Sequence, residues 1–465
     1  MHIDGEKLKF NFFAHSEKNI FSSSVFAGAK KNITVAEKQP GLSVKTIAGS
    51  GDKVSLSEEA LRASAIAPEK YGKESLTTLR TSSGKLLTIE DKGRGEYVLN
   101  TTNSDGEAES HSIVGDVIVT EDADGLLRIN PYSKGDETDG DDIIIGTTGK
   151  DISGGGGNDQ IVSLGSGKNY NKNGLIDSGG GNDSVFVFGV ASEIDIVTGD
   201  GNDSITALMS SVTNIDSGDG DDLIEGVKVH GKIETGDGND QIKVKGEIYG
   251  TINTGEGDDN INSSWRISGV LKTGSGNDNI YAVYDMNADL QTEDGDDKVS
   301  AGYSITGNVE TGQGNDKLKA EHEINGNIDT GEGDDELEAG YDIEGNVDTG
   351  DGNDRVEAGY SIGGNLKAGD GNDLVEAGNE IIGDIDTGAG QDVVWAGYSI
   401  DGNVRTRDGS DIVSAGYSIT GEIETGKGSD TVRIGYALTG SIDSGDAPDA
   451  VVIGRSSKRK EYQSN

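Results

Sequence analysis

The hydrophobic residues of this chain alternate with polar residues over short runs that are separated by glycine. In residues 349–367, TGDGNDRVEAGYSIGGNLK, the apolar Val356 and Ala358 flank Glu357, and Leu366 lies between two polar residues. Alternation with a period of two is typical of β-strands. A helix with this density of glycine would lose about 1 kcal/mol at each one relative to alanine. The pattern therefore predicts two short strands per 19 residues, joined by tight turns.

The same 19-residue pattern recurs along most of the chain with an aspartate at its sixth place. The regular copies carry Asp203, Asp222, Asp240, Asp259, Asp278, Asp297, Asp316, Asp335, Asp354, Asp373, Asp392, Asp411, Asp430 and Asp449, and looser copies carry Asp142, Asp159 and Asp183. Repeats of this length mark a solenoid, in which each coil buries its apolar face by stacking on its neighbours. We therefore expect an all-β fold, a parallel β-solenoid (β-helix or β-roll) of 19-residue coils. Its thirteen regular steps of ~4.8 Å would span about 60 Å.

The first 135 residues lack the repeat. We expect a small, partly disordered N-terminal region at 1–135, the solenoid at 136–455 and a disordered tail at 456–465. Ser57 is suited to cap a short helix, EEALRASA. Strand-like runs occupy residues 85–91, 96–101, 113–120 and 126–129. These strands would form either a small β domain or a cap over the open end of the solenoid.

Composition narrows the classes of partner. The formal net charge is −45, with 74 glycines, no cysteine and only 5% aromatic residues. Such a charge argues against nucleic acid and against an anionic membrane, and it favours cations. No apolar run is long enough to span a membrane, and the first residues lack the apolar run of a cleavable signal peptide. Without cysteine the chain has neither disulfides nor thiolate metal sites, and the redox compartment stays open.

The turn TGDGND suggests a metal site. Glycine permits a tight loop that directs carbonyl oxygens inward, and Asp354 adds a carboxylate beside those of the coils above and below. Several flexible oxygen ligands suit Ca²⁺ better than Mg²⁺, and GxGxDxUx, with U apolar, is a calcium-binding repeat pattern. We expect roughly one Ca²⁺ per coil interface, at Asp159, Asp183, Asp203, Asp222, Asp240, Asp259, Asp278, Asp297, Asp316, Asp335, Asp354, Asp373, Asp392, Asp411 and Asp430.

Ordinary turn chemistry is the alternative, because Asn and Asp favour turns without any metal. Two observations favour calcium. Carboxylates stacked about 4.8 Å apart would repel one another unless neutralised. A simple turn would also accept asparagine or serine at the sixth place, yet every regular copy keeps aspartate. Folding is therefore expected to depend on calcium.

Residues 142–454 resemble the RTX family of calcium-binding repeat proteins, and they are most similar to the 19-residue repeats in the ice-binding modules of bacterial RTX antifreeze adhesins. The resemblance implies a calcium-bound parallel β-helix in a secreted bacterial protein. In that family a third-place threonine belongs to the ice-facing array. Here the third place holds mostly acidic residues such as Asp351 and never threonine. We therefore expect the scaffold to carry over without ice binding.

A second column lies two places beyond the repeated alanine. It comprises Trp265, Tyr284, Tyr303, His322, Tyr341, Tyr360, Asn379, Tyr398, Tyr417 and Tyr436. A stack of aromatic rings that stabilises neighbouring coils is the simpler interpretation. The alternative is that its aromatic members (Trp265, Tyr284, Tyr303, Tyr341, Tyr360, Tyr398, Tyr417 and Tyr436) form an exposed strip for a polysaccharide or a protein partner. An asparagine column (Asn308, Asn327, Asn346, Asn365 and Asn403) is interpreted as a structural ladder.

Catalysis has little support in the sequence. The five histidines occur in no metalloprotease motif, and GSGKN at 165–169 lacks the residues of a phosphate-binding loop. We expect a non-enzymatic, calcium-binding, extracellular solenoid that acts as a binding, adhesin-like or structural module. The alternative is a carrier solenoid for a small enzymatic or effector region within 1–135. About eleven residues follow the last coil, which argues against a C-terminal secretion signal.

Overall fold

The computed structural model describes residues 34–36, 46–49, 52–54, 75–81, 83–93, 96–102, 108–121, 127–146, 150–164, 174–188, 194–445 and 448–454. The chain divides into two compact units, Met1–Glu74 and Ser75–Asn465. In the first unit, β1 (Thr34–Ala36), β2 (Thr46–Gly49) and β3 (Asp52–Val54) form an antiparallel sheet. The helix expected after Ser57 and the tail at 456–465 lie outside the described residues.

The second unit begins with an antiparallel sheet of four strands. These are β4 (Ser75–Arg80), β5 (Leu86–Gly93), β6 (Glu96–Thr102) and β7 (Ala108–Ile113), and the hairpin β8 (Val117–Glu121) and β9 (Leu127–Pro131) follows. The predicted strands at 85–91, 96–101 and 126–129 are confirmed to within two residues. The single strand predicted at 113–120 is wrong, because Gly115, with φ of 79°, turns the chain between β7 and β8. β4 was not predicted.

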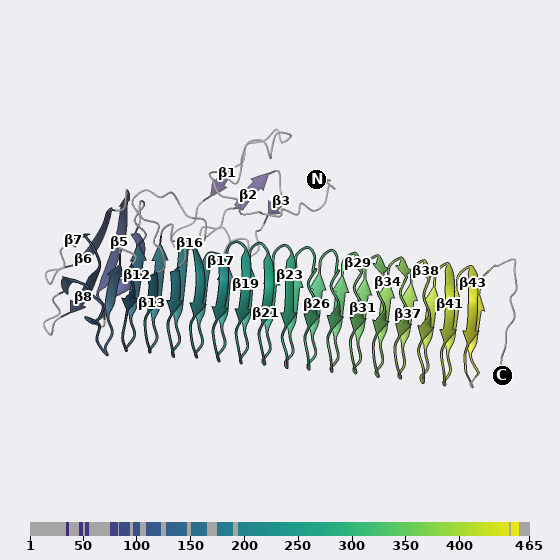
Figure 1. Cartoon of the computed structure of the whole chain (residues 1–465). Coiled ribbons are helices and arrows are strands. Elements are labelled where there is room, and N and C mark those ends of the chain that lie inside the picture. Colours follow the sequence, from purple (N-terminus) through teal and green to yellow (C-terminus); the bar gives the residue numbers. More distant parts are fainter. Residues whose placement is uncertain are drawn as a thin grey trace. The chain divides into compact units, whose positions relative to one another are not determined.

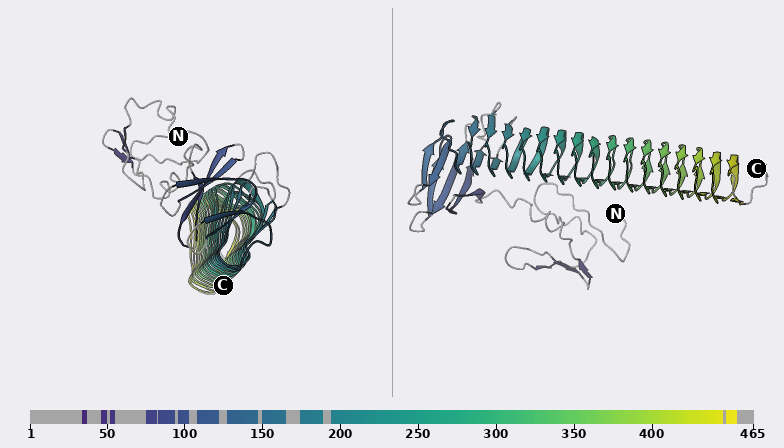
Figure 2. Two further views of the ribbon diagram at one scale, coloured as in Figure 1. Left: turned by 90° about the vertical axis from the view of Figure 1, so that its left-hand side faces the viewer. Right: turned by 90° about the horizontal axis from the view of Figure 1, so that it is seen from below.

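From β10 onward the chain forms a row of parallel coils (Figures 1 and 2). Equivalent strands of successive coils pair in parallel, so that Val356 lies between Leu337 and Val375. The early strands are β10 (Ile143–Gly146), β11 (Ile152–Ser153), β12 (Gln160–Leu164), β13 (Gly174–Asp177), β14 (Ser184–Phe188), β15 (Ile194–Val197), β16 (Ser204–Asp216), β17 (Leu223–Glu234), β18 (Gln241–Val244), β19 (Ile248–Asn253), β20 (Asn260–Ser263), β21 (Ile267–Lys272), β22 (Asn279–Ala282), β23 (Met286–Gln291), β24 (Lys298–Ala301), β25 (Val309–Glu310), β26 (Lys317–Ala320) and β27 (Ile328–Asp329). The predicted parallel β-solenoid of 19-residue coils is confirmed.

From β28 to β39 the coils contain three short strands each, one more than the sequence predicted, whereas the last coils again contain two. In residues 349–367 these are β31 (Arg355–Ala358), β32 (Ser361–Ile362) and β33 (Leu366–Lys367). The additional strand arises because Ile362 is fully buried and its backbone pairs with the equivalent isoleucines of both neighbouring coils. The other strands are β28 (Glu336–Ala339), β29 (Asp342–Ile343), β30 (Val347–Asp348), β34 (Leu374–Ala377), β35 (Glu380–Ile381), β36 (Ile385–Asp386), β37 (Val393–Ala396), β38 (Ser399–Ile400), β39 (Val404–Arg405), β40 (Ile412–Ala415), β41 (Ser418–Glu424), β42 (Thr431–Ile434), β43 (Ala437–Asp443) and β44 (Ala450–Ile453).

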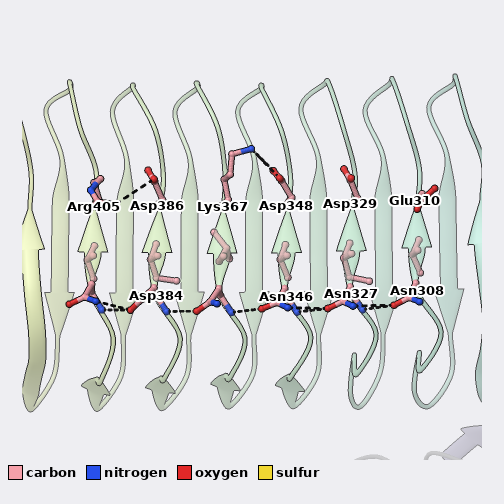
Figure 3. Close-up of a pocket in the computed structure, with 18 of the residues that line it drawn as sticks. Asn308, Glu310, Asn327, Asp329, Asn346, Asp348, Lys367, Asp384, Asp386 and Arg405 are labelled. Carbon is pink, nitrogen blue, oxygen red and sulfur yellow. Dashed lines mark hydrogen bonds and ion pairs between the residues drawn. The ribbon is translucent and has the colours of Figure 1, made fainter.

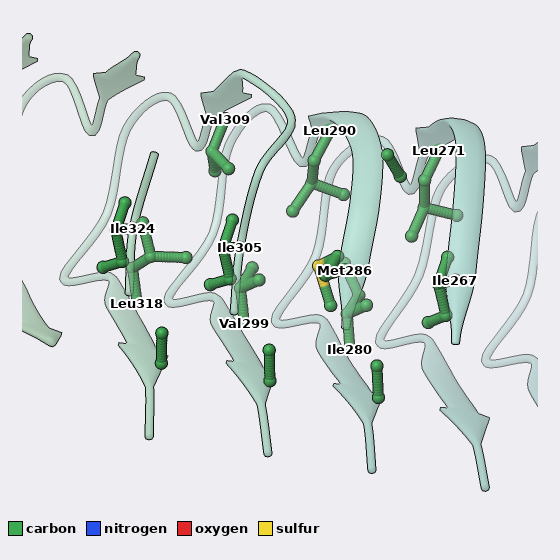
Figure 4. Close-up of a cluster of buried hydrophobic side chains, with 14 of the residues drawn as sticks. Ile267, Leu271, Ile280, Met286, Leu290, Val299, Ile305, Val309, Leu318 and Ile324 are labelled. Carbon is green, nitrogen blue, oxygen red and sulfur yellow. The ribbon is translucent and has the colours of Figure 1, made fainter. Parts of the chain in front are cut away.

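The core is a thin column of aliphatic side chains, and each coil contributes one residue at each core position (Figure 4). Val356, Ala358, Ile362 and Leu366 all point inward and are at most 2% exposed. Each coil therefore buries its apolar residues against the coils above and below, as a solenoid requires. Among the described residues, no helix is long and apolar enough to cross a membrane.

The two ends of the solenoid differ. At the start, β8 pairs antiparallel with β10, and the β4–β7 sheet packs its own apolar residues, such as Leu87, onto Val162 and Phe186 of the first coils. This arrangement matches the cap that the sequence allowed. At the other end, Val451 of the last coil is half-buried and Val452 is 58% exposed. The core is thus covered at the N-terminal end and open among the described residues at the C-terminal end.

Candidate metal centre

The sixth-place aspartates form one continuous column inside the corner of the coils. Asp354 lies in the turn that joins β30 to β31, and the other aspartates of the column lie in the equivalent turns. The backbone N–H of Asp335 donates to Oδ1 of Asp354 at 2.9 Å, and the N–H of Asp354 donates to Oδ1 of Asp373 at 2.9 Å. The same bond recurs from Asp142 to Asp449. Each carboxylate is thereby fixed by the coil before it.

The second carboxylate oxygen is buried, and in most coils it has no hydrogen-bond partner. This holds for Oδ2 of Asp159, Asp183, Asp203, Asp222, Asp240, Asp259, Asp278, Asp297, Asp316, Asp335, Asp354, Asp373, Asp411 and Asp430. Two corners differ. Oδ2 of Asp142 accepts bonds from the N–H and hydroxyl of Thr138, and Oδ2 of Asp392 accepts the hydroxyl of Thr387 at 2.6 Å. Buried polar atoms are rarely left unpaired, so an unpaired oxygen repeated along the column points to an absent partner.

A threonine column accompanies the aspartates, and the sequence interpretation missed it. The first place of the repeat, five residues before the aspartate, holds threonine in most coils, and Thr349 there is fully buried. Its hydroxyl donates to the carbonyl of the next coil's first residue, as Thr330 does to Thr349 at 3.3 Å. The threonine that recurs directly before the GxGxD motif in the sequence could have revealed this column. Serine takes this place at Ser178, Ser217 and Ser444, and among the regular copies only Ala368 lacks a hydroxyl there.

Glycine brings backbone carbonyl groups close together at the same corner. Gly350 has φ of 80°, a conformation that favours glycine. A Cβ atom at Gly350 would also collide with the carbonyl oxygen of Gly331 in the preceding coil. The glycine is therefore required both by its dihedral angle and by the close approach of a carbonyl oxygen.

Burial dominates the electrostatics of the column. It is the main cause that raises the pKa of Asp354 to about 6, of Asp297 to about 7 and of Asp373 to about 8. Nearby aspartates act in the same direction, whereas the backbone N–H from the preceding coil and, at Asp354 and Asp297, the hydroxyls of Thr349 and Thr292 lower the pKa. The exposed aspartate one place earlier behaves in the opposite way. The N–H of Asn315 donates to Asp296, and this bond lowers the pKa of Asp296. Without a cation the column is therefore partly protonated at neutral pH, because burial disfavours the charged form.

The residues of the corner fit calcium. No group of three or more His, Cys, Asp or Glu side chains gathers to hold a metal among the described residues. An ion at the corner would therefore take one or two carboxylate oxygens from the column and the remainder from backbone carbonyls. Such oxygen donors suit a hard cation such as Ca²⁺, whereas Zn²⁺ prefers nitrogen and sulfur. The sequence-predicted metal residues all lie in this column, with Asp392 distinguished by its bond to Thr387.

The predicted aromatic column is a face-to-face stack. Ring centroids of Tyr341 and Tyr360 are 4.9 Å apart, as are those of Tyr398 and Tyr417. The remaining contacts are Trp265–Tyr284, Tyr284–Tyr303, Tyr303–His322, His322–Tyr341 and Tyr417–Tyr436. The exposed tyrosines of the stack, such as Tyr360 at 43%, have a ring against at least one face. The surface they offer consists largely of ring edges and hydroxyl groups.

The asparagine column lines a shallow groove of about 830 Å³ on another face of the solenoid (Figure 3). The side-chain amide of Asn346 donates to Oδ1 of Asn327 at 3.2 Å, and Asn327 repeats the bond to Asn308. The second wall carries charged residues, among them Lys367, which pairs with Asp348 at 3.0 Å. Because these polar groups bond to one another along the coils, the ladder interpretation of this column agrees with the structure.

Comparisons with known proteins add a likeness of fold. No protein-family model matches the chain, and no curated protein matches it. Among solved structures, a hyperactive, Ca²⁺-dependent, β-helical antifreeze protein from an Antarctic bacterium is similar at 24% identity. The alignment covers 58% of this chain and 78% of that protein, with a TM-score of 0.38. At this level no statement about the function of this chain rests on the similarity.

Proposed function

We propose that calcium ions neutralise the aspartate column and that the chain is a calcium-dependent, non-catalytic solenoid of the RTX type. The observation that carries this proposal is the row of buried, unpartnered Oδ2 atoms. An ionised carboxylate in such a site requires a cation or a proton. Proton uptake would satisfy each oxygen only near or below its raised pKa. Above that pKa only a cation such as calcium satisfies it.

Calcium stoichiometry tests this proposal. Equilibrium dialysis of the full chain at pH 7.5 should find about one ion per corner with an unpartnered aspartate oxygen. Oxygen-only sites of flexible geometry should also select Ca²⁺ over Mg²⁺. Binding of no more than one or two ions, or equal binding of both cations, would contradict the proposal.

We further propose that the protein acts outside the cell, as a scaffold or adhesin-like module of a bacterium. Extracellular calcium modules bind calcium with dissociation constants of about 10⁻⁴–10⁻³ M. Calcium outside the cell would therefore favour the folded solenoid after export. The exposed edges of the tyrosine stack provide the surface for a polysaccharide. A pull-down on insoluble cellulose and chitin tests this role. Replacing Tyr341, Tyr360 and Tyr398 with phenylalanine keeps the stack and removes the hydroxyls, so undiminished binding by that variant would exclude hydroxyl recognition.

A further inference from the structure

One solvent-facing row of the solenoid changes from charged to apolar over three successive coils. The strands β28 and β31 begin with Glu336 and Arg355, whereas β34, β37 and β40 begin with Leu374, Val393 and Ile412. These three side chains are adjacent, because Val393 pairs in register with the other two. Ile412 is exposed, and Leu374 and Val393 are half-buried. They form an apolar strip that runs along the solenoid.

Trp395 adds an aromatic ring beside this strip. It lies two residues after Val393 in β37, so both side chains point to the outer face of the strand. Trp395 is 37% exposed. Cη2, at the tip of the indole ring, lies 3.4 Å from the point that a Cβ atom of Gly397 would occupy. The ring therefore reaches over the glycine turn that follows the strand.

Trp395 offers a ring face that the tyrosine stack does not. Stacked tyrosines such as Tyr398 and Tyr417 cover one another's faces. In the row of Trp395, the in-register neighbours are Glu376 in the preceding coil and Ser414 in the following coil. Neither neighbour places a ring against the indole. An exposed aromatic face next to an aliphatic strip is suited to pack on an apolar ligand surface.

Polar groups on both sides of the indole are available to a ligand. Glu357 in the same row is engaged in an ion pair with Arg355. Within the part of the chain that the structure describes, no ion pair or side-chain hydrogen bond engages Glu376 or Ser414. Both residues are half-buried. A carboxylate and a hydroxyl group thus flank Trp395, each at a distance of one coil, about 4.8 Å along the solenoid.

A neutral polysaccharide has the surface that matches this arrangement. A pyranose ring with equatorial hydroxyl groups presents C–H groups on its face and hydroxyl groups around its edge. The C–H face would pack on the indole and the aliphatic strip, while the hydroxyls would bond to Glu376 and Ser414. Ligand sites commonly combine such an apolar and aromatic lining with a few polar groups. A net charge of −45 disfavours an anionic polymer.

A second copy of the chain matches the strip less well. Stable protein interfaces bury about 800 Å² on each partner and involve roughly 20–30 residues on each side. Here the apolar surface consists of four side chains, Leu374, Val393, Trp395 and Ile412. Two molecules that each carry a charge of −45 also repel one another. The size of the strip therefore suits a few sugar rings rather than a protein.

We propose that Trp395, the apolar strip and the flanking Glu376 and Ser414 form the binding site of a neutral polysaccharide. One sugar ring stacks on Trp395, and the polymer runs along the strip. This inference rests on the proposed role as a polysaccharide-binding module, and it places the ring-stacking contact of that module at Trp395. Tyr398, three residues later in the same coil, adds its exposed edge to the surface.

Tryptophan fluorescence and retention on insoluble polymers test this site. The chain contains two tryptophans, Trp265 and Trp395. In a Trp265→Phe variant with saturating calcium, cellohexaose or chitohexaose should change the emission of Trp395. Trp395→Ala should weaken retention of the full chain on cellulose or chitin at least about tenfold.

Tyr281→Ala is the matched control. Tyr281 occupies the place of Trp395 in another coil and is similarly exposed, at 39%, but Asn279 and Lys298 stand there in the row of the apolar strip. This variant should change retention by less than about twofold. Circular dichroism in calcium should be the same for both variants and for the wild type, because each replaced side chain lies on the outer face.

Unchanged Trp395 emission together with undiminished retention of the Trp395→Ala variant would overturn the site. If the wild type is still retained, the proposed polysaccharide role survives and its contacts lie elsewhere, for example on the tyrosine edges. Failure of the wild type to bind cellulose, chitin or either oligosaccharide would contradict the polysaccharide role and the site together. A wild-type dimer in sedimentation experiments that Val393→Lys dissociates would assign the strip to a second copy and would also overturn the sugar site.

Discussion

Asp296 and Asp297 are adjacent in the chain and lie in opposite environments. Asp297 is 2% exposed, and one of its carboxylate oxygens is buried without a partner. Asp296 is exposed and accepts the backbone N–H and the side-chain amide of Asn315. Burial raises the pKa of Asp297 to about 7, whereas the bonds from Asn315 lower the pKa of Asp296. The same carboxyl group is thus buried with an unpartnered oxygen at one position and hydrogen-bonded at the surface at the next.

These two residues provide a matched pair of substitutions. Asp297→Asn should remove a calcium ligand and lower the free energy of unfolding in calcium by about 1–3 kcal/mol, the cost of one lost buried polar interaction. Asp296→Asn keeps the acceptor for Asn315. It should change the free energy of unfolding by less than about 0.5 kcal/mol. In chelator at pH 8 the Asp297→Asn substitution should instead raise the free energy of unfolding, because it removes a buried charge. Thermal melts in calcium and the residual β signal of the circular dichroism spectrum in chelator measure these effects, and equal effects of the two substitutions would contradict the site.

The raised pKa values predict how the calcium-free protein responds to pH. A carboxyl whose pKa is higher in the folded than in the unfolded state binds a proton more tightly when folded, so stability falls as pH rises. For Asp354 and Asp373 the folded pKa values are about 6 and about 8, against an ordinary value of 3.8. Their contribution is complete below pH 4 and is lost as pH rises through 6 to 8.

Circular dichroism melts of decalcified protein between pH 5 and 7 should therefore show a falling melting temperature, with most of the β signal lost by pH 8. In saturating calcium the decline should be much smaller, since the ion replaces the proton. A decalcified protein that is most stable at pH 8 would contradict the assigned burial of the column.

Glycine at the metal corner should tolerate no side chain. Gly350→Ala places a Cβ against the carbonyl oxygen of Gly331 and forces alanine to φ of 80°. We expect a loss of at least about 2 kcal/mol in unfolding free energy. Gly363→Ala is the control in the same coil, because its nearest non-neighbouring atoms lie 3.7 Å away. Urea unfolding monitored by circular dichroism compares the two, and similar losses would show that the corner geometry is not decisive.

The aromatic stack should contribute according to the number of ring neighbours. Tyr417 has Tyr398 and Tyr436 on its two faces, each at 4.9 Å, whereas Tyr360 stacks on Tyr341 and faces Asn379. The two tyrosines are similarly exposed, at 40% and 43%. Tyr417→Ala should therefore cost about 0.5–1.5 kcal/mol more than Tyr360→Ala, the worth of one aromatic pair. Equal melting temperatures for the two variants would argue against stacking as the role of this column.

The repeat made most of the solenoid predictable from sequence. The spacing of the aspartates identified both the coil and the column, because side chains 19 residues apart stack directly on one another. The strand at Ser361–Ile362 was missed, since two residues show no alternation and become a strand only through pairing with Ile343 and Ile381.

The site was predictable as a column of residues but not in its detail. Sequence alone could not show that Oδ1 of each aspartate is held by a backbone N–H while Oδ2 is left without a partner. It also could not show that Thr387 satisfies Asp392 within its own turn. These features depend on side-chain torsions and on the distance between coils. The strands of the N-terminal cap were less predictable, because they belong to no repeat and β4 carries mixed residues, SLTTLR.

The most direct test of calcium-dependent folding is far-ultraviolet circular dichroism of the full chain at pH 8, before and after removal of calcium. Column carboxylates such as Asp297 would then be ionised and unneutralised. The account predicts loss of most of the β signal on chelation and its recovery when Ca²⁺, but not Mg²⁺, is restored. An unchanged β spectrum in calcium-free buffer would contradict it.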